Sequence, residues 1–451
     1  MKTPVNINQW VDGCKFTRLH WALFLLCVAI ITFDGYALTT YGPTVPLIMR
    51  EWKLTPTQAG VIGSYALLGA AFGAVGFGVL ADWWGRKATV IACTVLFAVA
   101  TGFTGLATNP TTFGVWRFVA GLGLGGAMPN VVAVMTEYAP MRLRAFVVAG
   151  IFSGFQIGGV CGSLLSVLLF PLWGWRSVYY IGFLALLVVP LCLMYFPDSP
   201  YFYFAKGRTV ELRKVLLKIR PELMIEDGAT FEANRTGKAS VAALFQEHRG
   251  MSTIAIWIVV FMDFYLIFGL GIWLPKLMMN AGYALSSSLW FSSAYFAGAF
   301  IGILAAGKCA DRWGAKLVLY MCFPAAFVAI TLLAFHPGTA LIVILVAIAG
   351  GATSGGQAVT IAYSALFYPP AMRAAGQGFT FGMGRLGAVF GPAIAGILMS
   401  MKLSLLTLFL GVSIPGLLAC LAVVFIQDRY GFAALAGKSP IVQNAAESLT
   451  R

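Results

Sequence analysis

Three charged residues stand inside long apolar stretches of the sequence, where an ionisable side chain is costly. Asp34, Asp263 and Arg385 each lie about twelve residues into such a stretch, which in a membrane-spanning helix corresponds to a depth of about 18 Å, close to the midplane. A carboxyl group in a medium of low dielectric readily holds a proton, and a guanidinium presents a planar fork to a carboxylate. These residues are therefore candidates for proton transfer and for binding an organic anion, with interhelical ion pairs as the alternative.

Two further residues extend this set. Gln156 is neutral and occupies the position equivalent to Arg385 in an internal repeat described below. Arg117 lies in the fourth apolar stretch, about six residues from its expected outer end. Two interpretations of Arg117 stay open: a functional charge within the membrane, and an interfacial arginine whose side chain extends to the membrane surface.

The composition places these residues in a membrane protein. Of the 451 residues, 60% are hydrophobic and 10% are charged, against roughly 45–50% apolar and about 25% charged residues in soluble domains. So few charges cannot build a water-soluble surface of this size, which excludes a soluble enzyme, a disordered chain and a secreted disulfide scaffold. The eight cysteines occur singly, without CxxC or metal-ligand spacing, and are interpreted as small buried residues.

Twelve apolar stretches are long enough to cross a bilayer, which takes about 20 residues in a helix. They run at 22–47, 58–80, 88–108, 111–137, 145–170, 177–197, 251–279, 287–307, 316–336, 338–367, 374–401 and 403–427. The sequence therefore predicts an all-α integral membrane protein with twelve transmembrane helices. Its expected parts are an N-terminal half (1–197), a linker (198–250), a C-terminal half (251–427) and a tail (428–451). Within the linker, Leu212, Val215, Leu216 and Ile219 have helical spacing and predict one or two surface helices.

The distribution of positive charge predicts the orientation. Twenty-three of the 30 Lys and Arg residues fall in the termini and in the loops on the same side, and five fall in the opposite loops. Cytoplasmic loops of membrane proteins carry such an excess, so both termini and the linker are expected in the cytoplasm. Because the net charge of +14 is scattered along the chain, it does not indicate a nucleic-acid partner.

The two halves repeat at a shift of 229 residues. The shift pairs Asp34 with Asp263, Tyr36 with Tyr265, Gly42 with Gly271, Gly78 with Gly307, Asp82 with Asp311, Gly85 with Gly314 and Lys87 with Lys316. Two six-helix halves in the same orientation, with a substrate site near the midplane between them, are typical of transporters.

Two of the repeated segments are loops with a recognisable motif. Residues 78–87 and 307–316 resemble the G-x-x-x-D-R-x-G-R-K signature of the major facilitator superfamily, with Trp83 in place of the first Arg and Ala315 in place of a basic residue. Glycines permit tight turns and close helix approach. A gating latch between the halves is predicted, with a static loop salt bridge as the alternative, at Gly78, Asp82, Gly85, Arg86, Lys87, Gly307, Asp311 and Gly314.

The first helix narrows the resemblance. Residues 33–38 resemble the D-G-[YF]-D signature of the aromatic acid:proton symporter family, and the segments 126–130, 197–200 and 382–387 are similar to that family as well. The similarity covers roughly residues 20–430. One position departs from the motif, because Ala37 stands where the family has its second acid. Either Asp34 alone serves proton coupling in this chain, or coupling is impaired.

This resemblance implies a secondary active transporter, not an enzyme, that imports a benzoate-like carboxylate with protons by alternating access. It would reside in the inner membrane as a monomer within the lipid bilayer and use the proton gradient in place of a cofactor. Proton coupling is assigned to Asp34 and Asp263. Substrate binding is assigned to Arg385, Arg117, Tyr36, Gln156, Phe155, Tyr265 and Phe381. For each aromatic residue taken singly, plain packing is the simpler interpretation.

Two other functions fit the same residues. One is an efflux antiporter of the same superfamily. The other is a membrane sensor that binds aromatic acids without moving them.

Overall fold

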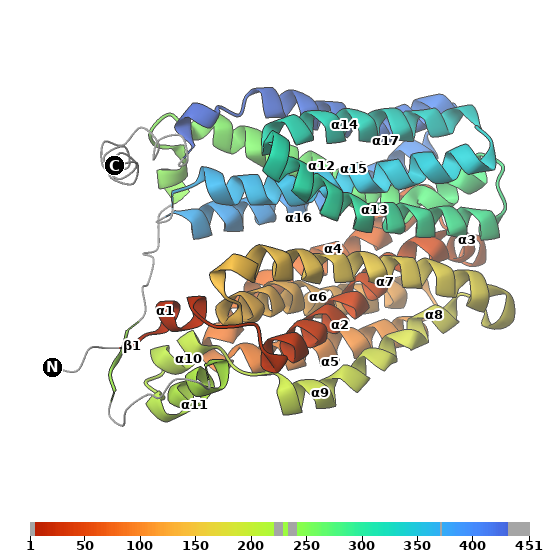
Figure 1. The fold of residues 1–451 in the computed structure, drawn as a ribbon. Helices are drawn as coiled ribbons and strands as arrows, with labels where there is room; N and C mark the ends of the chain where they lie inside the picture. The colour runs from red at the N-terminus through yellow and green to blue at the C-terminus, as the bar shows by residue number, and fades with distance from the viewer. Residues whose placement is uncertain (1–4, 221–228, 233–240, 370–371, 432–451) are drawn as a thin grey trace. The chain divides into compact units, whose positions relative to one another are not determined.

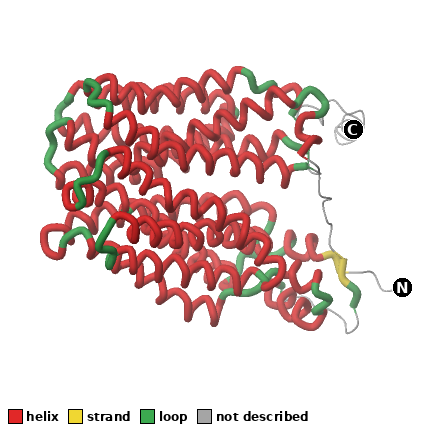
Figure 2. The backbone as a smooth tube through the Cα atoms, turned by 180° about the vertical axis from the view of Figure 1, so that it is seen from behind, coloured by secondary structure: helices red, strands yellow, loops and turns green. Residues whose placement is uncertain are grey.

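The computed structural model describes residues 5–220, 229–232, 241–369 and 372–431, and nearly all of them are helical (Figures 1 and 2). Twelve helical segments in these ranges are long and apolar enough to cross a membrane, which confirms the predicted fold class. The segments match the predicted stretches to within a few residues at most of their ends.

The first six spans begin with a broken helix. It consists of α2 (Arg18–Thr39) and α3 (Tyr41–Glu51), and α4 (Pro56–Trp84), α5 (Arg86–Thr104), α6 (Pro110–Tyr138) and α7 (Arg144–Trp173) follow. The sixth span combines α8 (Arg176–Tyr180), the 3-10 helix η2 (Ile181–Leu187) and α9 (Val188–Tyr195). Side chains that accept bonds from the first free N–H groups fix the starts of two of these helices, namely Thr55 for α4 and Asn109 for α6.

The second six spans are α12 (Gly250–Asn280), α13 (Leu285–Trp313), α14 (Ala315–Leu332), α15 (Thr339–Phe367), α16 (Arg373–Ser400) and α17 (Leu405–Val424). The short 3-10 helix η4 (Leu333–Phe335) extends α14. By proximity of its residues, the chain divides into two compact units. The N-terminal unit comprises Met1–Arg235 and Ile272–Phe296, and the C-terminal unit comprises Thr236–Gly271 and Ala297–Arg451.

The break in the first span follows from its prolines. Pro43 has no N–H to offer the carbonyl of Thr39, and Pro46 likewise leaves the carbonyl of Gly42 without its helical donor. The chain turns at Thr40, between α2 and α3, and the hydroxyls of Thr39 and Thr40 bond back to carbonyls of the preceding turn. The helix that carries Asp34 therefore ends near the middle of the span, and its last carbonyls need other donors.

Glycines let the first and fifth spans approach each other closely in the N-terminal unit. A Cβ added to Gly158 of α7 would lie 2.1 Å from the carbonyl oxygen of Thr32, and one added to Gly35 of α2 would lie 2.1 Å from that of Phe155. The C-terminal unit repeats the arrangement, because a Cβ on Gly387 of α16 would lie 2.0 Å from the carbonyl oxygen of Phe261. Gly158 and Gly387 are themselves related by the 229-residue shift.

The linker contains two short helices, α10 (Pro200–Ala205) and α11 (Thr209–Ile219), which confirms the predicted surface helices. The N-terminal segment adds structure that the sequence pattern did not indicate. Strand β1 (Val5–Asn6) pairs in parallel with β2 (Phe231–Glu232), and α1 (Ile7–Asp12) follows it. Trp10 of α1 donates to the carbonyl of Leu216, and Asp12 pairs with Arg144 at 2.7 Å. The N-terminal segment thus binds both the linker and the start of α7.

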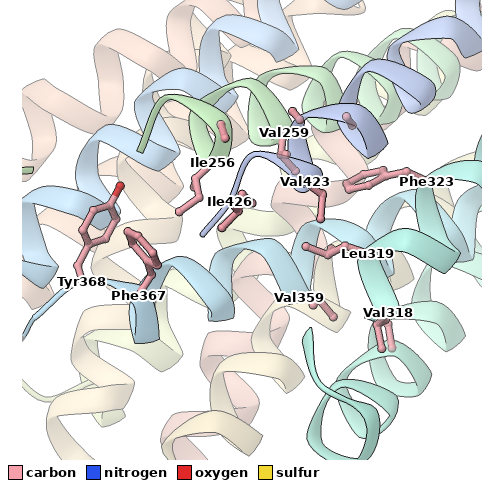
Figure 3. Packing of buried hydrophobic residues seen from close by; sticks show 14 of the residues in the cluster. Ile256, Val259, Val318, Leu319, Phe323, Val359, Phe367, Tyr368, Val423 and Ile426 are labelled. Carbon is pink, nitrogen blue, oxygen red and sulfur yellow. The ribbon is translucent and has the colours of Figure 1, made fainter. Parts of the chain in front are cut away.

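Apolar side chains from α12, α14, α15 and α17 fill the core of the C-terminal unit. Figure 3 shows Ile256 and Val259 of α12 facing Val423 of α17, with Leu319 and Phe323 of α14 beside them. The 3-10 helix η3 (Val241–Phe245) precedes α12 in the sequence, and the 3-10 helix η5 (Asp428–Tyr430) follows α17.

Candidate functional site

The two midplane acids occupy equivalent places in their units. Asp34 of α2 is 3% exposed and interacts electrostatically with the thiol of Cys93 of α5. Asp263 of α12 is fully buried and interacts with Cys322 of α14. Cys93 and Cys322 are also related by the 229-residue shift, so the repeat duplicates an acid–thiol pair. Sequence reasoning missed these cysteines, although the shift that paired the acids also pairs them.

Arg117 of α6 is bound to the break in the first span. Its Nη1 donates to the carbonyl of Ala37 at 2.9 Å and its Nη2 to that of Leu38 at 3.4 Å. Its Cζ lies 4.9 Å from the centre of the Tyr41 ring, and only 2% of the residue is exposed. The guanidinium therefore does not extend to the membrane surface, and the alternative of an interfacial arginine is wrong.

The position of Arg117 explains how a broken helix is tolerated inside a membrane. The carboxyl end of α2 carries partial negative charge and carbonyls without helical donors, and a cation satisfies both. Among the described residues, no carboxylate pairs with this guanidinium, and its Nε has no hydrogen-bond partner. Ala37, the residue that departs from the family motif, is 2% exposed and lies in the turn that Arg117 binds.

The glycine contacts indicate which helix faces carry Gln156 and Arg385. Each stands two residues before a glycine that touches the neighbouring helix, Gly158 in α7 and Gly387 in α16. Two residues correspond to about 200° around a helix, so each side chain starts on the face opposite that contact. Gln156 is 5% exposed and Arg385 is half-buried.

The predicted aromatic residues differ in what they contribute. The hydroxyl of Tyr36 donates to the carbonyl of Val178 at 2.6 Å, which fixes the ring within the N-terminal unit. Tyr265 is 5% exposed, and its carbonyl packs against Gly391. Phe155 and Phe381 are half-buried. Tyr36 is thus held within its own unit by a hydrogen bond to the backbone.

The glycines of the two motif loops play different parts. Gly85 and Gly314 have φ angles of +93° and +88° and end α4 and α13, so these repeat-related positions make the tight turns that were predicted. Gly78 and Gly307 do not mediate close packing, because a Cβ at either would meet no atom of the described residues within 4 Å.

The basic residues of the first motif loop bind within the N-terminal unit. Arg86 donates to Asn130 of α6 at 2.9 Å and lies 3.7 Å from Glu137. Lys87 donates through Nζ to the carbonyl of Leu193 at 2.6 Å and through its backbone N–H to Asp198 at 3.2 Å. Glu137 and Asp198 were not predicted as site residues, although the motif at 197–200 was noted. The loop thus joins the ends of α6 and α9.

The second motif loop repeats part of this pattern in the C-terminal unit. Lys316, the repeat mate of Lys87, donates through Nζ to the carbonyl of Ile426 at 2.6 Å and lies 3.9 Å from Asp428. Each loop lysine therefore binds the end of the last helix in its own half. Asp82 and Asp311 are exposed and make no hydrogen bond or ion pair with the described parts of the chain.

Known proteins resemble this chain over nearly its whole length. The family model described as Major Facilitator Superfamily matches residues 24–293 and 256–440. The benzoate transport protein of Acinetobacter baylyi is 38% identical over 95% of this chain and 94% of its own length. The gentisate transporter of Corynebacterium glutamicum is 33% identical over 93% of this chain and 90% of its own, and the 4-hydroxybenzoate transporter PcaK of Pseudomonas putida is 30% identical over 93% and 95%.

The fold also matches a solved structure. The partially occluded, inward-open xylose transporter XylE from E. coli superposes with a TM-score of 0.73 and 15% identity, covering 91% of this chain and 97% of that one. At this identity, the likeness concerns the fold alone.

Replacing Arg117 by Ala should destabilise the protein, because two carbonyls at the α2 break lose a charged donor. The expected loss is about 1.5–3 kcal/mol in the free energy of unfolding. Thermal unfolding of the purified protein in detergent measures it, with Arg142→Ala as control, because that arginine is exposed and makes no hydrogen bond or ion pair with the described residues. A melting temperature of Arg117→Ala equal to that of the control would contradict a structural role for this guanidinium.

Proposed function

The chain belongs to the major facilitator superfamily, and on that premise we propose that it imports an aromatic carboxylate, benzoate or a close analogue, together with protons. The 38% identity to the benzoate transport protein over 95% of this chain carries the proposal. Relatives named for 4-hydroxybenzoate and gentisate support the wider class of aromatic acids. The chain is a multi-pass membrane protein and not an enzyme, and the bacterial relatives favour the inner membrane.

Alternating access is the proposed mode of transport. The moving bodies are the six-helix halves 1–197 and 251–427, joined by the linker 198–250, with 428–451 as a tail. Repeat-related glycine contacts make each half tightly packed, which favours rigid-body motion over bending of single helices. A substrate drives such motion only if it binds the occluded state better than the open states.

Arg385 is the proposed anchor for the substrate carboxylate. Its planar fork matches the two oxygens of a carboxylate, and its side chain starts on the face of α16 opposite the contact with α12. Gln156, at the equivalent place in the N-terminal half, supplies a neutral donor and acceptor. Phe155, Tyr265 and Phe381 are proposed to contact the aromatic ring, and Arg117 positions the first span from which Tyr36 and Asp34 project.

Asp34 is the proposed carrier of the coupling proton. It is nearly fully buried about one helical turn before the break that Arg117 stabilises, so its surroundings depend on how α2 ends. Protonation of Asp34 and pairing of the substrate carboxylate with Arg385 would remove two net charges from the membrane interior. Closing the site away from water then costs less free energy.

The motif loops are the proposed gates. Arg86, Lys87 and Lys316 hold the ends of helices within their own halves, which leaves the exposed carboxylates of Asp82 and Asp311 as the groups able to form new contacts when the halves move. Such contacts act on the rate of the conformational change and not on the substrate itself.

Counterflow with a panel of radiolabelled benzoates in proteoliposomes tests the function as a whole. Saturable exchange of benzoate or a hydroxylated analogue, accelerated when the outside is acidic, is the expected result. Uptake driven by the opposite gradient would indicate an efflux antiporter. Saturable binding without counterflow would indicate a sensor. Either outcome would replace the proposal.

Replacement of Arg385 by Ala should weaken binding of the acid about 10- to 100-fold, because a bidentate charged pair contributes about 1.5–3 kcal/mol. Arg385→Lys should recover little, since an ammonium lacks the planar fork. Equilibrium binding of labelled benzoate to the purified protein measures both variants, with Arg142→Ala as the control. Wild-type affinity in Arg385→Ala would place the anchor elsewhere.

The gating proposal separates rate from affinity. Asp82→Asn or Asp311→Asn should slow counterflow several-fold and leave the equilibrium Kd for the acid within a factor of a few, because neither residue touches the substrate. Glu211→Gln, an exposed acid of α11, serves as the control for loss of one surface charge. A large loss of binding in Asp82→Asn would remove this residue from the gate.

The role of Asp34 is tested together with the motif departure at Ala37. Acids at 34 and 37 would share a helix face, and one at 37 would also lie beside Arg117. Ala37→Asp should therefore strengthen accumulation driven by an inside-alkaline gradient, and Asp34→Asn should weaken it at least several-fold with either residue at 37. Uptake into proteoliposomes with an imposed gradient measures this. Uphill uptake by the Asp34→Asn, Ala37→Asp double variant equal to that of Ala37→Asp alone would exclude Asp34 as a carrier of a coupling proton.

A further inference from the structure

Asp263 lies on the face of α12 that packs into the core of the C-terminal unit. Ile256, Val259, Asp263 and Leu266 recur at helical spacing, and each is 0% exposed. The first two point into the apolar cluster drawn in Figure 3. The acid therefore continues an apolar stripe on which a leucine or valine is the expected residue.

The carboxyl group has no hydrogen-bond partner in its surroundings. Both of its oxygens are buried without a donor among the described residues. Cys322 of α14 is the titratable group that faces it, and Cys309 of α13 lies next to that thiol. The described parts of α15, α16 and α17 contribute no charged or titratable group that interacts with Asp263, although α16 carries Arg385.

Energetics decide which form of the acid this place accepts. An ionised carboxylate without donors in an apolar core costs several kcal/mol more than the same group in water, and a neutral carboxylic acid costs far less. Asp263 therefore holds a proton in this conformation. The equivalent acid of the other half, Asp34, interacts with the repeat-related thiol of Cys93, so the repeat places an acid in both halves where packing alone does not require one.

We propose that Asp263 is a second proton-binding site of the transport cycle, enclosed by the C-terminal helices and separate from Asp34. The inference rests on the proposed function and adds to it that one more proton moves per substrate than Asp34 alone carries. In the step itself, the carboxylate takes a proton from water on one side of the membrane, forming its O–H bond. It returns that proton to water on the other side once the transport cycle admits water to it there.

The first experiment reads protonation directly and needs no transport. A hydrophobic carbodiimide, dicyclohexylcarbodiimide, reacts with protonated carboxyl groups in apolar surroundings: the acid oxygen bonds to the central carbon, its proton passes to nitrogen, and rearrangement leaves a stable N-acylurea. The full-length protein in proteoliposomes is treated between pH 5 and pH 9, and the labelled residues are mapped by mass spectrometry. A water-soluble carbodiimide, which labels the exposed carboxyls of Asp82 and Asp311, is the control.

Labelling of Asp263 by the hydrophobic reagent is expected at low pH, with at least a tenfold fall in rate toward pH 9 as turnover exposes and deprotonates the acid. Absence of label at Asp263, with other carboxyls labelled, would overturn the proposal. So would a label whose rate does not change with pH, because that result describes a permanently neutral structural acid. The measurement uses the unmodified chain, so it does not depend on the folding of a variant.

The second experiment tests participation in coupling. The ratio of protons to substrate is obtained from the pH gradient at which net flux of benzoate vanishes, a quantity independent of rate. In Asp263→Asn, which mimics the protonated acid, the ratio should fall by one, and in the control Glu211→Gln it should stay unchanged. An unchanged ratio in Asp263→Asn would exclude Asp263 from the cycle. Failure of every variant and of the wild type to move benzoate would instead reject the proposed function, while the labelling result would still stand.

Discussion

The structure depends on one constraint: a polar group inside a membrane must find a partner or lose its charge. The prolines of the first span break its helix and leave carbonyls without donors. Just before the break, Arg117 donates to the carbonyls of Ala37 and Leu38 at the end of α2. Asp263 meets the constraint in the opposite way, because its oxygens have no donor among the described residues and an apolar core favours the neutral acid. The surroundings of Arg117 accommodate a permanent charge, whereas those of Asp263 disfavour one.

Close helix contacts at glycines determine which faces of α7 and α16 carry the polar residues. Gly158 and Gly387 allow α7 and α16 to touch the backbones of α2 and α12, where any larger residue would meet a carbonyl oxygen. The residues two positions earlier, Gln156 and Arg385, therefore start on the opposite faces of their helices. Here the two halves differ, since one carries a neutral amide and the other a cation. The repeat thus places different polar side chains at equivalent positions of the two halves.

The motif loops bind helix ends within their own halves. Lys87 and Lys316 bind carbonyls at the ends of the last helices of their halves, and Asp198 and Asp428 lie beside them. These bonds lie within a half, so motion of the halves does not need to break them. Lys87 and Lys316 therefore hold helix ends within their own halves, and Asp82 and Asp311 of the same loops are exposed.

The sequence by itself determined the twelve spans, the repeat and the positions of Asp34, Asp263, Arg117 and Arg385, because apolar length, spacing and cost of burial are local properties. Only the tertiary structure decided which groups meet. The sequence left the interfacial alternative for Arg117 open because its carbonyl partners lie about 80 residues away along the chain. Glu137 and Asp198 were missed for the same reason, since their partners Arg86 and Lys87 are also distant in sequence. Contacts between residues distant in sequence depend on how helices cross. Glycine contacts and proline breaks in several helices set these crossings together, so no single segment of the sequence reveals them.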